Sequence, residues 1–457
     1  MTVSQSETYR IADLGQNILN RKIHLRGWVR TRRGSKGFSF IQLNDGSNLS
    51  GLQVIADEKL ENYEEISKLS TGAALEVWGT LVESQGRGQD FELQSEQILI
   101  RGTAPGEEYP LQKKGHTLEF LRDIAHLRPR TNTLGAVFRI RNTLSQAIHR
   151  FFQDRGFLYV HTPIITANDA EGAGEMFHVT SLDLEQLPKT KAGKVDYDQD
   201  FFGTDVSLTV SGQLGAEVFA LAFTNVYTFG PTFRAENSNT ARHASEFWMI
   251  EPEVAFNDLY DNMELAEQFV EYIVQRTLKN KAEELKAIER DTSGLEKIKG
   301  PFPRLHYAEA CEIIKKENPD FVVGDDFGAP DETIISSQYD KPVFVHHYPA
   351  AIKAFYMKAD DDDPKYSMSC DLLATEGYGE IIGGGQREES YETLVGKIKE
   401  HDLNQEDFDW YLDLRKYGTF PHSGFGLGLE RTVAWVCGLN HVRETIPFPR
   451  LYGRYHP

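Results

Sequence analysis

The sequence lacks several features that would place the protein in well-defined classes. It has three cysteines in 457 residues, Cys311, Cys370 and Cys437, and they lie too far apart to form a zinc site or a disulfide framework. No apolar run approaches the roughly 20 residues that a membrane span needs. The polar start, MTVSQSETYR, lacks the basic-then-apolar pattern of a signal peptide. We therefore expect a soluble protein of a reducing compartment, the cytoplasm.

Positive charge is also scarce, since 49 Lys and Arg against 69 Asp and Glu give a net charge of −20. Taken over the whole chain, this balance disfavours a nucleic-acid partner, because phosphate binding requires Lys and Arg. The charge is uneven, however, because residues 21–40 contain seven basic residues and no acidic one. The local field decides binding, so the sequence still allows RNA to engage a limited positive surface.

Short alternating segments separated by turn signals fill the N-terminal part. The segments HLRGWVR, GFSFIQLND, LSGLQVIA, AALEVWGTLV and DFELQSEQILI alternate apolar and polar residues between glycine-containing turns. This pattern is typical of a small antiparallel β-barrel of about five strands. We predict a barrel domain over 1–103, followed by a linker or hinge over 104–131, where Pro, Gly and charged residues gather.

The remaining chain, 132–457, has a different pattern. Apolar residues recur at helical spacing after Val137 and stop at Gly156, which is expected to close that helix. Strand-like runs such as VYTFGPTF, EFWMIEPEVAF and GEIIGG then alternate with helical stretches, the longest at 262–289. This arrangement predicts an α+β domain with a mostly antiparallel sheet flanked by helices. The polar, patternless segment 183–205 is predicted to be a loop.

One segment, FGPTFRAENSNTARHASEFWMIEPE at 229–253, combines two strand-like pieces with a polar loop. The first strand is followed by Arg234, the loop holds Arg242, and the second strand carries Phe247. Guanidinium groups bind the oxygens of a triphosphate, and an aromatic ring can stack on a purine. A solvated hairpin with incidental ion pairs would have the same composition, so this segment alone leaves both interpretations open.

A second segment, HSGFGLGLERTVAWVCG at 422–438, places Gly424, Gly426 and Gly428 directly before a helical stretch. The spacing lacks the full dinucleotide-binding fingerprint and its βαβ context. Glycines that let the backbone approach a ligand, followed by Arg431 at the helix start, would place a cation over a nucleotide. The alternative is a Gly-rich strand that packs tightly on its neighbour.

Taken together, the two segments resemble motifs 2 (about 226–256) and 3 (about 422–438) of the class II aminoacyl-tRNA synthetases. The helix ending in FFQDRGFLYVHTPIIT resembles motif 1 (about 140–166), and the barrel resembles the OB-fold with which the aspartate–asparagine–lysine subgroup binds the anticodon. The resemblance covers residues 20 to 457. It implies a ligase that charges tRNA, with ATP as substrate, Mg²⁺ as cofactor, and a homodimer through the segment around Pro163.

The amino acid is suggested by three positions of this resemblance. Aspartate-specific members carry a lysine in a stretch similar to VSGQLGAE, and this sequence has Ala216 there. They carry an Asp where this sequence has Glu251, and the arginine that binds the side-chain oxygen corresponds to Arg387. One cation and one carboxylate suit a primary amide, whereas a second carboxylate would be repelled. Several strings, among them IKAFYMK and YLDLRKYGTF, also resemble the asparagine-specific members.

The resemblance implies further roles at the nucleotide. The residues expected to bind ATP lie in motifs 2 and 3: Arg234, Glu236, Arg242, His243, Phe247, Gly428 and Arg431. Arg234 is expected to bridge the substrate carboxylate and the α-phosphate, while Phe247 and Arg431 hold the two faces of the adenine. Arg234 and Arg431 are therefore the expected catalytic residues, which act by positioning and charge neutralisation. Asp371 and Glu380 are the expected Mg²⁺ ligands.

Two further sets of residues follow from the resemblance. The amino-acid pocket is expected to contain Glu171, Ser211, Gln213, Glu251 and Arg387. The anticodon is expected to contact Arg32, Phe40 and Gln53, with Phe40 stacking on a base.

Three alternative functions remain open at this stage. A non-discriminating aspartate enzyme of the same subgroup would use the same fold. An asparagine synthetase-like paralogue would amidate aspartate without tRNA, although such relatives lack the anticodon barrel. A tRNA-binding regulator with an inactive domain would have lost its arginines and carboxylates, yet Arg234, Asp371 and Arg431 are all present.

Overall fold

The computed structural model describes residues 6–86, 88–112, 115–168, 176–238 and 240–457. The chain divides into two compact units, one ending at Gly135 and the other beginning at Ala136. Each unit has its own hydrophobic core. Among the helices of these described ranges, none combines the length and the apolar character needed to cross a membrane.

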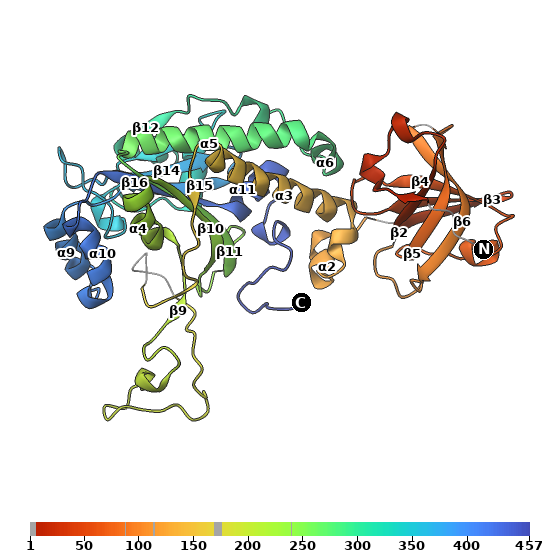
Figure 1. Ribbon diagram of the computed structural model, residues 1–457. Coiled ribbons are helices and arrows are strands. Elements are labelled where there is room, and N and C mark those ends of the chain that lie inside the picture. Colours follow the sequence, from red (N-terminus) through yellow and green to blue (C-terminus); the bar gives the residue numbers. More distant parts are fainter. Residues whose placement is uncertain (1–5, 87, 113–114, 169–175, 239) are drawn as a thin grey trace. The chain divides into compact units, whose positions relative to one another are not determined.

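The first unit contains a closed β-barrel (Figure 1). Its strands follow the order β1-β2-β3-β4-β6-β5, and a pairing of β2 with β5 closes the sheet. The predicted five-stranded barrel is thereby confirmed, with the two-residue β1 as an addition. The predicted antiparallel pairing is wrong for β4 and β6, which pair in parallel. The strands are β1 (Glu7–Thr8), β2 (Lys22–Ser35), β3 (Phe38–Asn44), β4 (Leu52–Asp57), β5 (Ala74–Glu83) and β6 (Phe91–Gly102). Alternate residues fill the barrel interior, as the period-two pattern requires; Ile41 and Val54 are completely buried.

Two short helices complete this unit. Helix α1 (Tyr63–Ile66) lies between β4 and β5. Helix α2 (Leu118–Asp123) follows the barrel, and the side chain of Thr117 caps it by accepting a hydrogen bond from the backbone N–H of Phe120.

The second unit is built on an eight-stranded sheet in the order β12-β13-β14-β15-β16-β11-β10-β7. Only the outer pairs β12–β13 and β7–β10 are parallel, so the predicted mostly antiparallel sheet is confirmed. The strands are β7 (Leu158–Tyr159), β10 (Asn225–Phe233), β11 (Glu246–Ala255), β12 (Arg304–His306), β13 (Val343–His346), β14 (Ser369–Ala374), β15 (Gly379–Gln386) and β16 (His422–Gly428). A separate pair, β8 (Ile165–Thr166) and β9 (Ser207–Leu208), lies outside this sheet.

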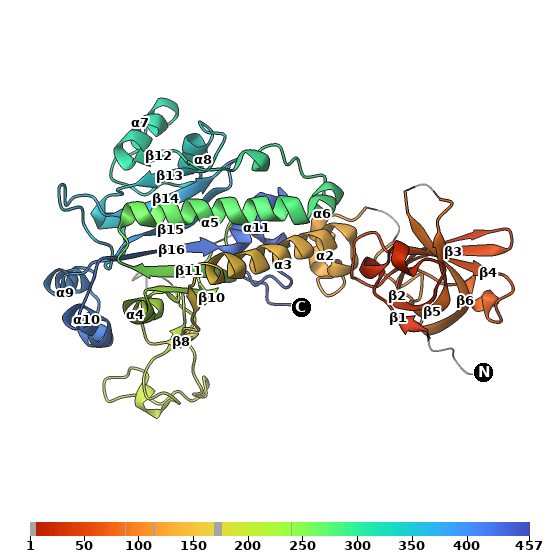
Figure 2. The same ribbon diagram turned by 45° about the horizontal axis from the view of Figure 1, so that its top comes forward.

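Long helices cover one face of this sheet. Helices α3 (Asn132–Gln153) and α5 (Leu259–Asn280) run side by side across it (Figures 1 and 2). The apolar residues of α3 that recur at helical spacing are completely buried, which confirms the predicted helix; Gly156 follows it with a φ of +77°. The remaining helices are α6 (Ala282–Ala287), α7 (Tyr307–Glu317), α8 (Ala329–Ser336), α9 (Tyr391–Glu400), α10 (Asp409–Lys416) and α11 (Leu429–Cys437).

Helix α4 (Gln213–Phe223) covers the opposite face of the sheet, over β10 and β11. Gly212 precedes it, and a side chain at this position would collide with Thr162 and with the carboxylate of Glu251. Glycine therefore lets the start of α4 approach the sheet closely. Because strand residues alternate between faces, Phe247, Met249, Glu251 and Glu253 of β11 lie on one face.

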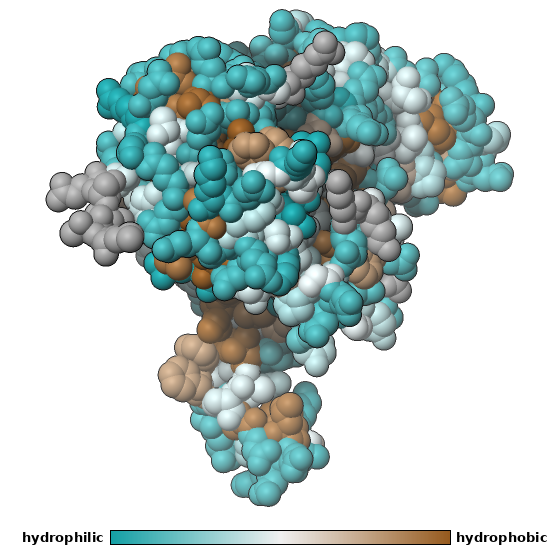
Figure 3. Space-filling view, turned by 90° about the vertical axis from the view of Figure 1, so that its right-hand side faces the viewer, coloured by the Kyte–Doolittle hydropathy of each residue, from teal (hydrophilic) through white to brown (hydrophobic). Residues whose placement is uncertain are grey.

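Residues 176–206, which lead into β9, form a projecting excursion (Figure 1). It includes the predicted loop 183–205 and is held by Asp200, which accepts hydrogen bonds from the hydroxyls of Thr180 and Ser181 and from two backbone N–H groups. Figure 3 shows apolar groups on this projection, where Leu184 is 72% exposed and Phe201 is 79% exposed.

Candidate functional site

A cavity opens above β11 and β16 in the second unit. Strand β11 pairs with β10 on one side and with β16 on the other, so the predicted hairpin and the predicted Gly-rich strand are neighbours in the sheet. The cavity lining includes all the residues expected to bind ATP: Arg234, Glu236, Arg242, His243, Phe247, Gly428 and Arg431. Two segments that are almost 200 positions apart in the sequence thus form one concave site of cations and aromatic surface.

Arg234 and Phe247 lie together in this cavity. The guanidinium carbon of Arg234 is 5.4 Å from the ring centroid of Phe247, within the range of a cation–π contact. The walls also contain the apolar side chains Ile381, Val442 and Leu451. A planar heterocycle and an anionic phosphate chain would both find complementary groups here.

Arg242 is held by groups outside the motif 2 hairpin. Its Nη1 lies 2.5 Å from Oε2 of Glu332 on α8, and its Nη2 donates to the backbone carbonyl of Gly377 at 2.7 Å. Burial raises the pKa of Glu332 to about 7, and the nearby Glu380 adds to this shift. For His243, burial lowers the pKa of the imidazole. Arg242 is therefore placed beside the cavity by an ion pair that the sequence analysis did not anticipate.

Asp371 and Glu380 converge from the neighbouring strands β14 and β15. A side chain at Gly383 would meet Oε1 of Glu380 at 2.7 Å and Oδ1 of Asp371 at 3.3 Å, so the two carboxylates point into the same space. Two carboxylates fit Mg²⁺, which is commonly bound by one or two of them together with phosphate oxygens and water. Among the residues with described positions, no group of three or more His, Cys, Asp or Glu side chains gathers around this space.

Both carboxylates are paired with cations. Nζ of Lys353 lies 2.9 Å from Asp371, and Nη1 of Arg431 lies 3.2 Å from Glu380. Burial raises the pKa of Asp371 to about 6, with Lys353 opposing and Glu380 reinforcing the shift. Burial would also raise the pKa of Glu380, but Arg431 and Lys353 together lower it. The site thus alternates positive and negative groups, as a magnesium–triphosphate ligand would require.

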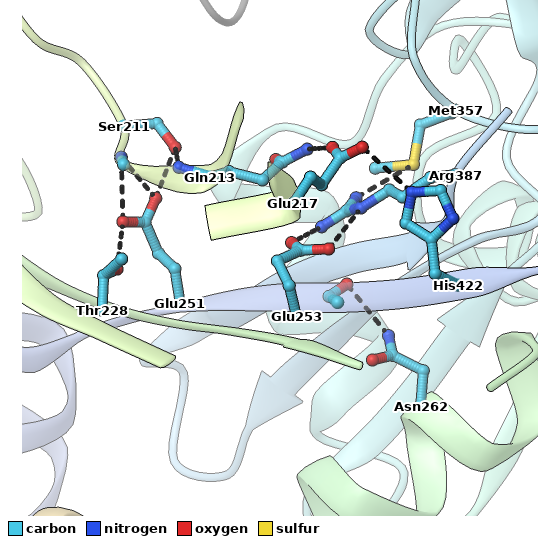
Figure 4. A network of polar contacts seen from close by, with 12 residues as sticks. Ser211, Gln213, Glu217, Thr228, Glu251, Glu253, Asn262, Met357, Arg387 and His422 are labelled. Atoms are coloured by element: carbon cyan, nitrogen blue, oxygen red, sulfur yellow. Dashed lines mark hydrogen bonds and ion pairs between the residues drawn. The ribbon is translucent and has the colours of Figure 1, made fainter. Parts of the chain in front are cut away.

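Glu251 is anchored by the loop before α4. Its carboxylate accepts hydrogen bonds from the hydroxyl of Ser211, from the backbone N–H of Gly212 at 3.0 Å, and from the hydroxyl of Thr228 at 2.9 Å (Figure 4). Glu251 is 3% exposed, and these donors hold it in one position. Ser211 therefore orients Glu251, in addition to any contact of its own with a ligand.

Arg387 pairs with Glu253 and not with Glu251. Its Nη2 lies 2.5 Å from Oε1 of Glu253 and its Nε 3.2 Å from Oε2, and both side chains are almost completely buried. The sequence analysis expected Arg387 and Glu251 to contact opposite ends of one substrate amide, and it did not anticipate that Glu253 pairs with the guanidinium of Arg387 (Figure 4). Burial raises the pKa of Glu253 to about 7, while Arg387 opposes the shift.

The remaining residues expected in the amino-acid pocket have different outcomes. Gln213 begins α4 and donates from Nε2 to Glu217 at 3.1 Å. Glu171 lies outside the described residues. Glu217 and Glu253 lie within the quoted segments VSGQLGAE and motif 2, but neither was assigned a role there. A charged residue within an apolar run, as in QLGAEVFALAF, indicates a buried ion pair.

The glycines of β16 include both kinds expected from the sequence, those that permit tight strand packing and those that face a cavity. A side chain at Gly424 would collide with the carboxylate of Glu253 and with the backbone of Pro252, so this glycine permits tight packing. Gly426 and Gly428 instead line the cavity. The adjacent Glu430 is structural, since it accepts from Arg141 of α3 at 2.7 Å and from the backbone N–H of Trp248 at 2.9 Å.

The barrel presents a second candidate site on the outer face of β2, β3 and β4. Directly paired residues of neighbouring strands share a face, and Phe40 pairs with Arg33 and with Ile55, while Gln53 pairs with Gln42. These side chains are half-buried or exposed, whereas the intervening residues fill the core. An aromatic ring beside an arginine and two amides is suited to an unstacked base.

Arg32 does not belong to this outer face. It pairs with the buried Ile41, and its Nε donates to the backbone carbonyl of Leu69 at 3.2 Å. The structure therefore does not bring Arg32 to the face of Phe40 and Gln53, and Arg33 lies there instead. The physical reason is a bulge between Val29 and Thr31, which shifts the strand alternation by one residue.

Comparison with known proteins gives a consistent result. The sequence profile described as tRNA synthetases class II (D, K and N) matches residues 118–452, and the one described as OB-fold nucleic acid binding domain matches 23–101. The asparagine–tRNA ligase of Desulfitobacterium hafniense is 53% identical over 443 residues, which cover 94% of this chain and 95% of the relative. The asparagine–tRNA ligase of Nostoc sp. is 53% identical over 438 residues, which cover 93% and 94%.

A solved structure extends this similarity to three dimensions. The asparaginyl-tRNA synthetase from Pyrococcus horikoshii, crystallised with asparaginyl-adenylate, superposes with a TM-score of 0.89 at 34% identity. The match covers 98% of this chain and 99% of that protein.

Proposed function

The chain belongs to the class II tRNA synthetases of the D, K and N group, and we propose that it acts as an asparagine–tRNA ligase. It activates L-asparagine with ATP, giving asparaginyl-adenylate and pyrophosphate, and then transfers asparagine to the 3′ end of its tRNA. Relatives that are 53% identical over nearly the whole chain are asparagine–tRNA ligases.

The observation that carries this proposal is the continuity of one face of β11. Phe247 and Met249 line the cavity with the arginines, and Glu251 follows two residues later on the same face. Four residues of an extended strand span about 13 Å, so Phe247 and Glu251 are separated by about the length of an elongated ligand. An adenylate would place its adenine at Phe247 and its amino-acid end at Glu251.

The first step requires positioning more than proton transfer. The asparagine carboxylate is already ionised and attacks the α-phosphate in line, so no general base is needed. Arg234 bridges the carboxylate and the α-phosphate, while Phe247 and Arg431 hold the adenine between them. Arg242 and His243 contact the outer phosphates, and Glu236 the adenine side of the nucleotide. Mg²⁺, held by Asp371 and Glu380, supplies charge neutralisation to the phosphate chain when it is bound.

Specificity for asparagine follows from the charges at the amino-acid end. Glu251 is an acceptor, so it suits the NH₂ of an amide and repels a carboxylate. Ala216 leaves no cation there to offset that repulsion. Arg387 offers its remaining N–H groups to the side-chain oxygen of asparagine. The closest alternative, a non-discriminating aspartate enzyme, would need such a cation.

The outer face of the barrel is the proposed anticodon site. Phe40 stacks on a base, Gln53 reads a base edge, and Arg33 holds the phosphate backbone. The barrel argues against an asparagine synthetase-like activity, which has no use for an anticodon site. The free thiols of Cys311, Cys370 and Cys437 are compatible with a cytoplasmic location.

A homodimer is the proposed assembly. Apolar side chains around Pro163 and on α4 are exposed, namely Leu158, Ile164, Ile165, Phe219 and Phe223. Exposed apolar surface of this extent is typical of an interface between copies.

The direct test of the function is aminoacylation with labelled asparagine, ATP and tRNA. We expect acid-precipitable label that requires ATP and tRNA. If the purified protein attaches no asparagine to tRNA but makes free asparagine from aspartate and ammonia, the synthetase-like alternative is correct.

A further inference from the structure

Glu217 of α4 is a completely buried carboxylate directly after Ala216. Its oxygens accept hydrogen bonds from four side chains that come from separate parts of the second unit. The donors are Nε2 of Gln213 at 3.1 Å, the hydroxyl of Tyr411 at 2.8 Å, Nη2 of Arg415 at 2.9 Å and Nε2 of His422 at 3.0 Å. No residue of this cluster except Gln213 was assigned a role in the reaction.

Burial of a carboxylate is costly unless charges and hydrogen bonds compensate it. Burial would raise the pKa of Glu217, but Arg415, His422 and Arg387 together hold it below its ordinary value. Glu217 is therefore ionised, and an ionised carboxylate can only accept hydrogen bonds. Each group that touches its oxygens must present a hydrogen to it.

This requirement fixes the orientation of the Gln213 side chain. The amide of glutamine has one donor end and one acceptor end, and Glu217 selects the donor end, Nε2. The acceptor, Oε1, is thereby turned to the other side. Gln213 is the first residue of α4, and its backbone N–H donates to the hydroxyl of Ser211, which in turn donates to Glu251 (Figure 4). Gln213 is thus linked through Ser211 to Glu251.

We propose that Glu217 is a positioning residue that holds the Gln213 amide so that Oε1 accepts a hydrogen bond from the α-ammonium group of the amino acid. The proposal rests on the proposed function, because it needs an amino acid in this pocket. The alternative is a purely structural role, in which Glu217 only connects α4 to α10 and β16. Its substitution would then lower stability without a specific effect on the binding of the amino acid.

The experiment is ATP–pyrophosphate exchange with the full-length protein, in which the KM for asparagine and the KM for ATP are measured separately. Glu217→Gln removes the preference for the donor end of the Gln213 amide, because a glutamine at 217 can face Gln213 with either end of its own amide. We expect the KM for asparagine to rise about tenfold, as the loss of one hydrogen bond to a charged group entails, while the KM for ATP stays the same. Tyr411→Phe is the matched control, since it removes a donor to the same carboxylate and leaves Gln213 bound.

The decisive comparison repeats Glu217→Gln in a Gln213→Leu background. Gln213→Leu has no amide to orient, so the second substitution should leave the KM for asparagine unchanged there. An equal rise in both backgrounds, or an equal rise in Tyr411→Phe, would overturn the proposal in favour of a packing role. If Glu217→Gln does not fold, the charge-balanced pair Glu217→Gln with Arg415→Gln is compared with Arg415→Gln alone, under the same criteria.

The wild-type protein distinguishes failure of the proposed function from failure of the role proposed for Glu217. Absence of asparagine-dependent exchange in the wild type would refute the proposed function itself. An active wild type whose KM for asparagine is the same as that of Glu217→Gln would refute only the role of Glu217.

Discussion

The guanidinium of Arg387 and the carboxylate of Glu253 form a two-point ion pair in which the side chains are 1% and 0% exposed. Arg387 follows β15, Glu253 lies on β11, and β16 runs between these strands, so the pair ties three strands together at the amino-acid end of the site. Glu253 uses two of the five N–H groups of the arginine. The proposal assigns the substrate's side-chain oxygen to the remaining N–H groups, while Glu253 fixes the plane of the guanidinium.

Removal of this arginine should cost both activity and stability. Arg387→Ala leaves Glu253 buried without its partner, which costs about 3–5 kcal/mol of unfolding free energy. Adding Glu253→Gln should recover most of that loss in urea unfolding, but exchange with asparagine should stay absent. Activity restored in the double variant would contradict a direct role of Arg387 at the substrate.

Arg234 should be essential for chemistry and dispensable for folding. Arg234→Ala removes the cation that is proposed to bridge the two reacting groups, so we expect asparagine-dependent pyrophosphate exchange to fall by at least about 100-fold. Thermal unfolding should change little. Arg150→Ala on the exposed surface of α3 is the control and should keep wild-type exchange. Substantial exchange in Arg234→Ala would remove this residue from the mechanism.

The pH dependence of stability should carry a signature of Glu332. Its pKa is about 7 in the folded protein and 4.5 ordinarily, so its stabilising contribution is complete below about pH 4.5 and is lost as the pH rises through about 7. Glu332→Gln stays neutral and escapes this loss. The unfolding free energy of the variant minus that of the wild type should therefore increase from pH 5 to pH 8, by up to about 3 kcal/mol.

Thermal and urea unfolding at several pH values measure this difference. The exposed Glu283→Gln on α6 serves as control, and its difference from the wild type should stay flat over the same range. A difference for Glu332→Gln that decreases as the pH rises would contradict the assignment.

The barrel should affect tRNA and leave amino-acid activation untouched. Phe40→Leu should raise the KM for tRNA in aminoacylation by about tenfold, because base stacking contributes about 1–3 kcal/mol per base. Arg33→Ala should raise it by about tenfold through loss of the proposed phosphate contact. Pyrophosphate exchange, which needs no tRNA, should be unaffected. Arg32→Ala should have a smaller effect, since Arg32 faces away from Phe40; a larger effect than that of Arg33→Ala would contradict the strand register.

Local patterns explain what the sequence could predict. The barrel follows from strand alternation and helix α3 from its apolar spacing, whereas the residues of the cavity were implied by the resemblance of two separate segments to motifs 2 and 3. The face on which Arg32 lies could not be predicted, because a bulge reverses the alternation without any change in composition. Only the paired strands reveal which of the two adjacent arginines faces outward.

Long-range partners could not be read from the sequence. Glu251 and Glu253 are two residues apart on the same face of β11, so composition cannot decide which of them binds Arg387. Two features of the structure select Glu253 as the partner of Arg387. Gly424 of β16 has no side chain and so leaves space for Glu253, and the loop before α4 holds Glu251 by hydrogen bonds. The ion pair of Arg242 with Glu332 joins residues 90 positions apart and is equally invisible in the sequence.

The most direct test of the central claim is pyrophosphate exchange with asparagine and with aspartate, measured side by side on the wild-type protein. The proposed pocket contains the carboxylate of Glu251, and position 216 is alanine where aspartate-specific members carry a lysine. We therefore predict exchange with asparagine and only background exchange with aspartate. Comparable exchange with aspartate would contradict the account and would identify a non-discriminating aspartate enzyme.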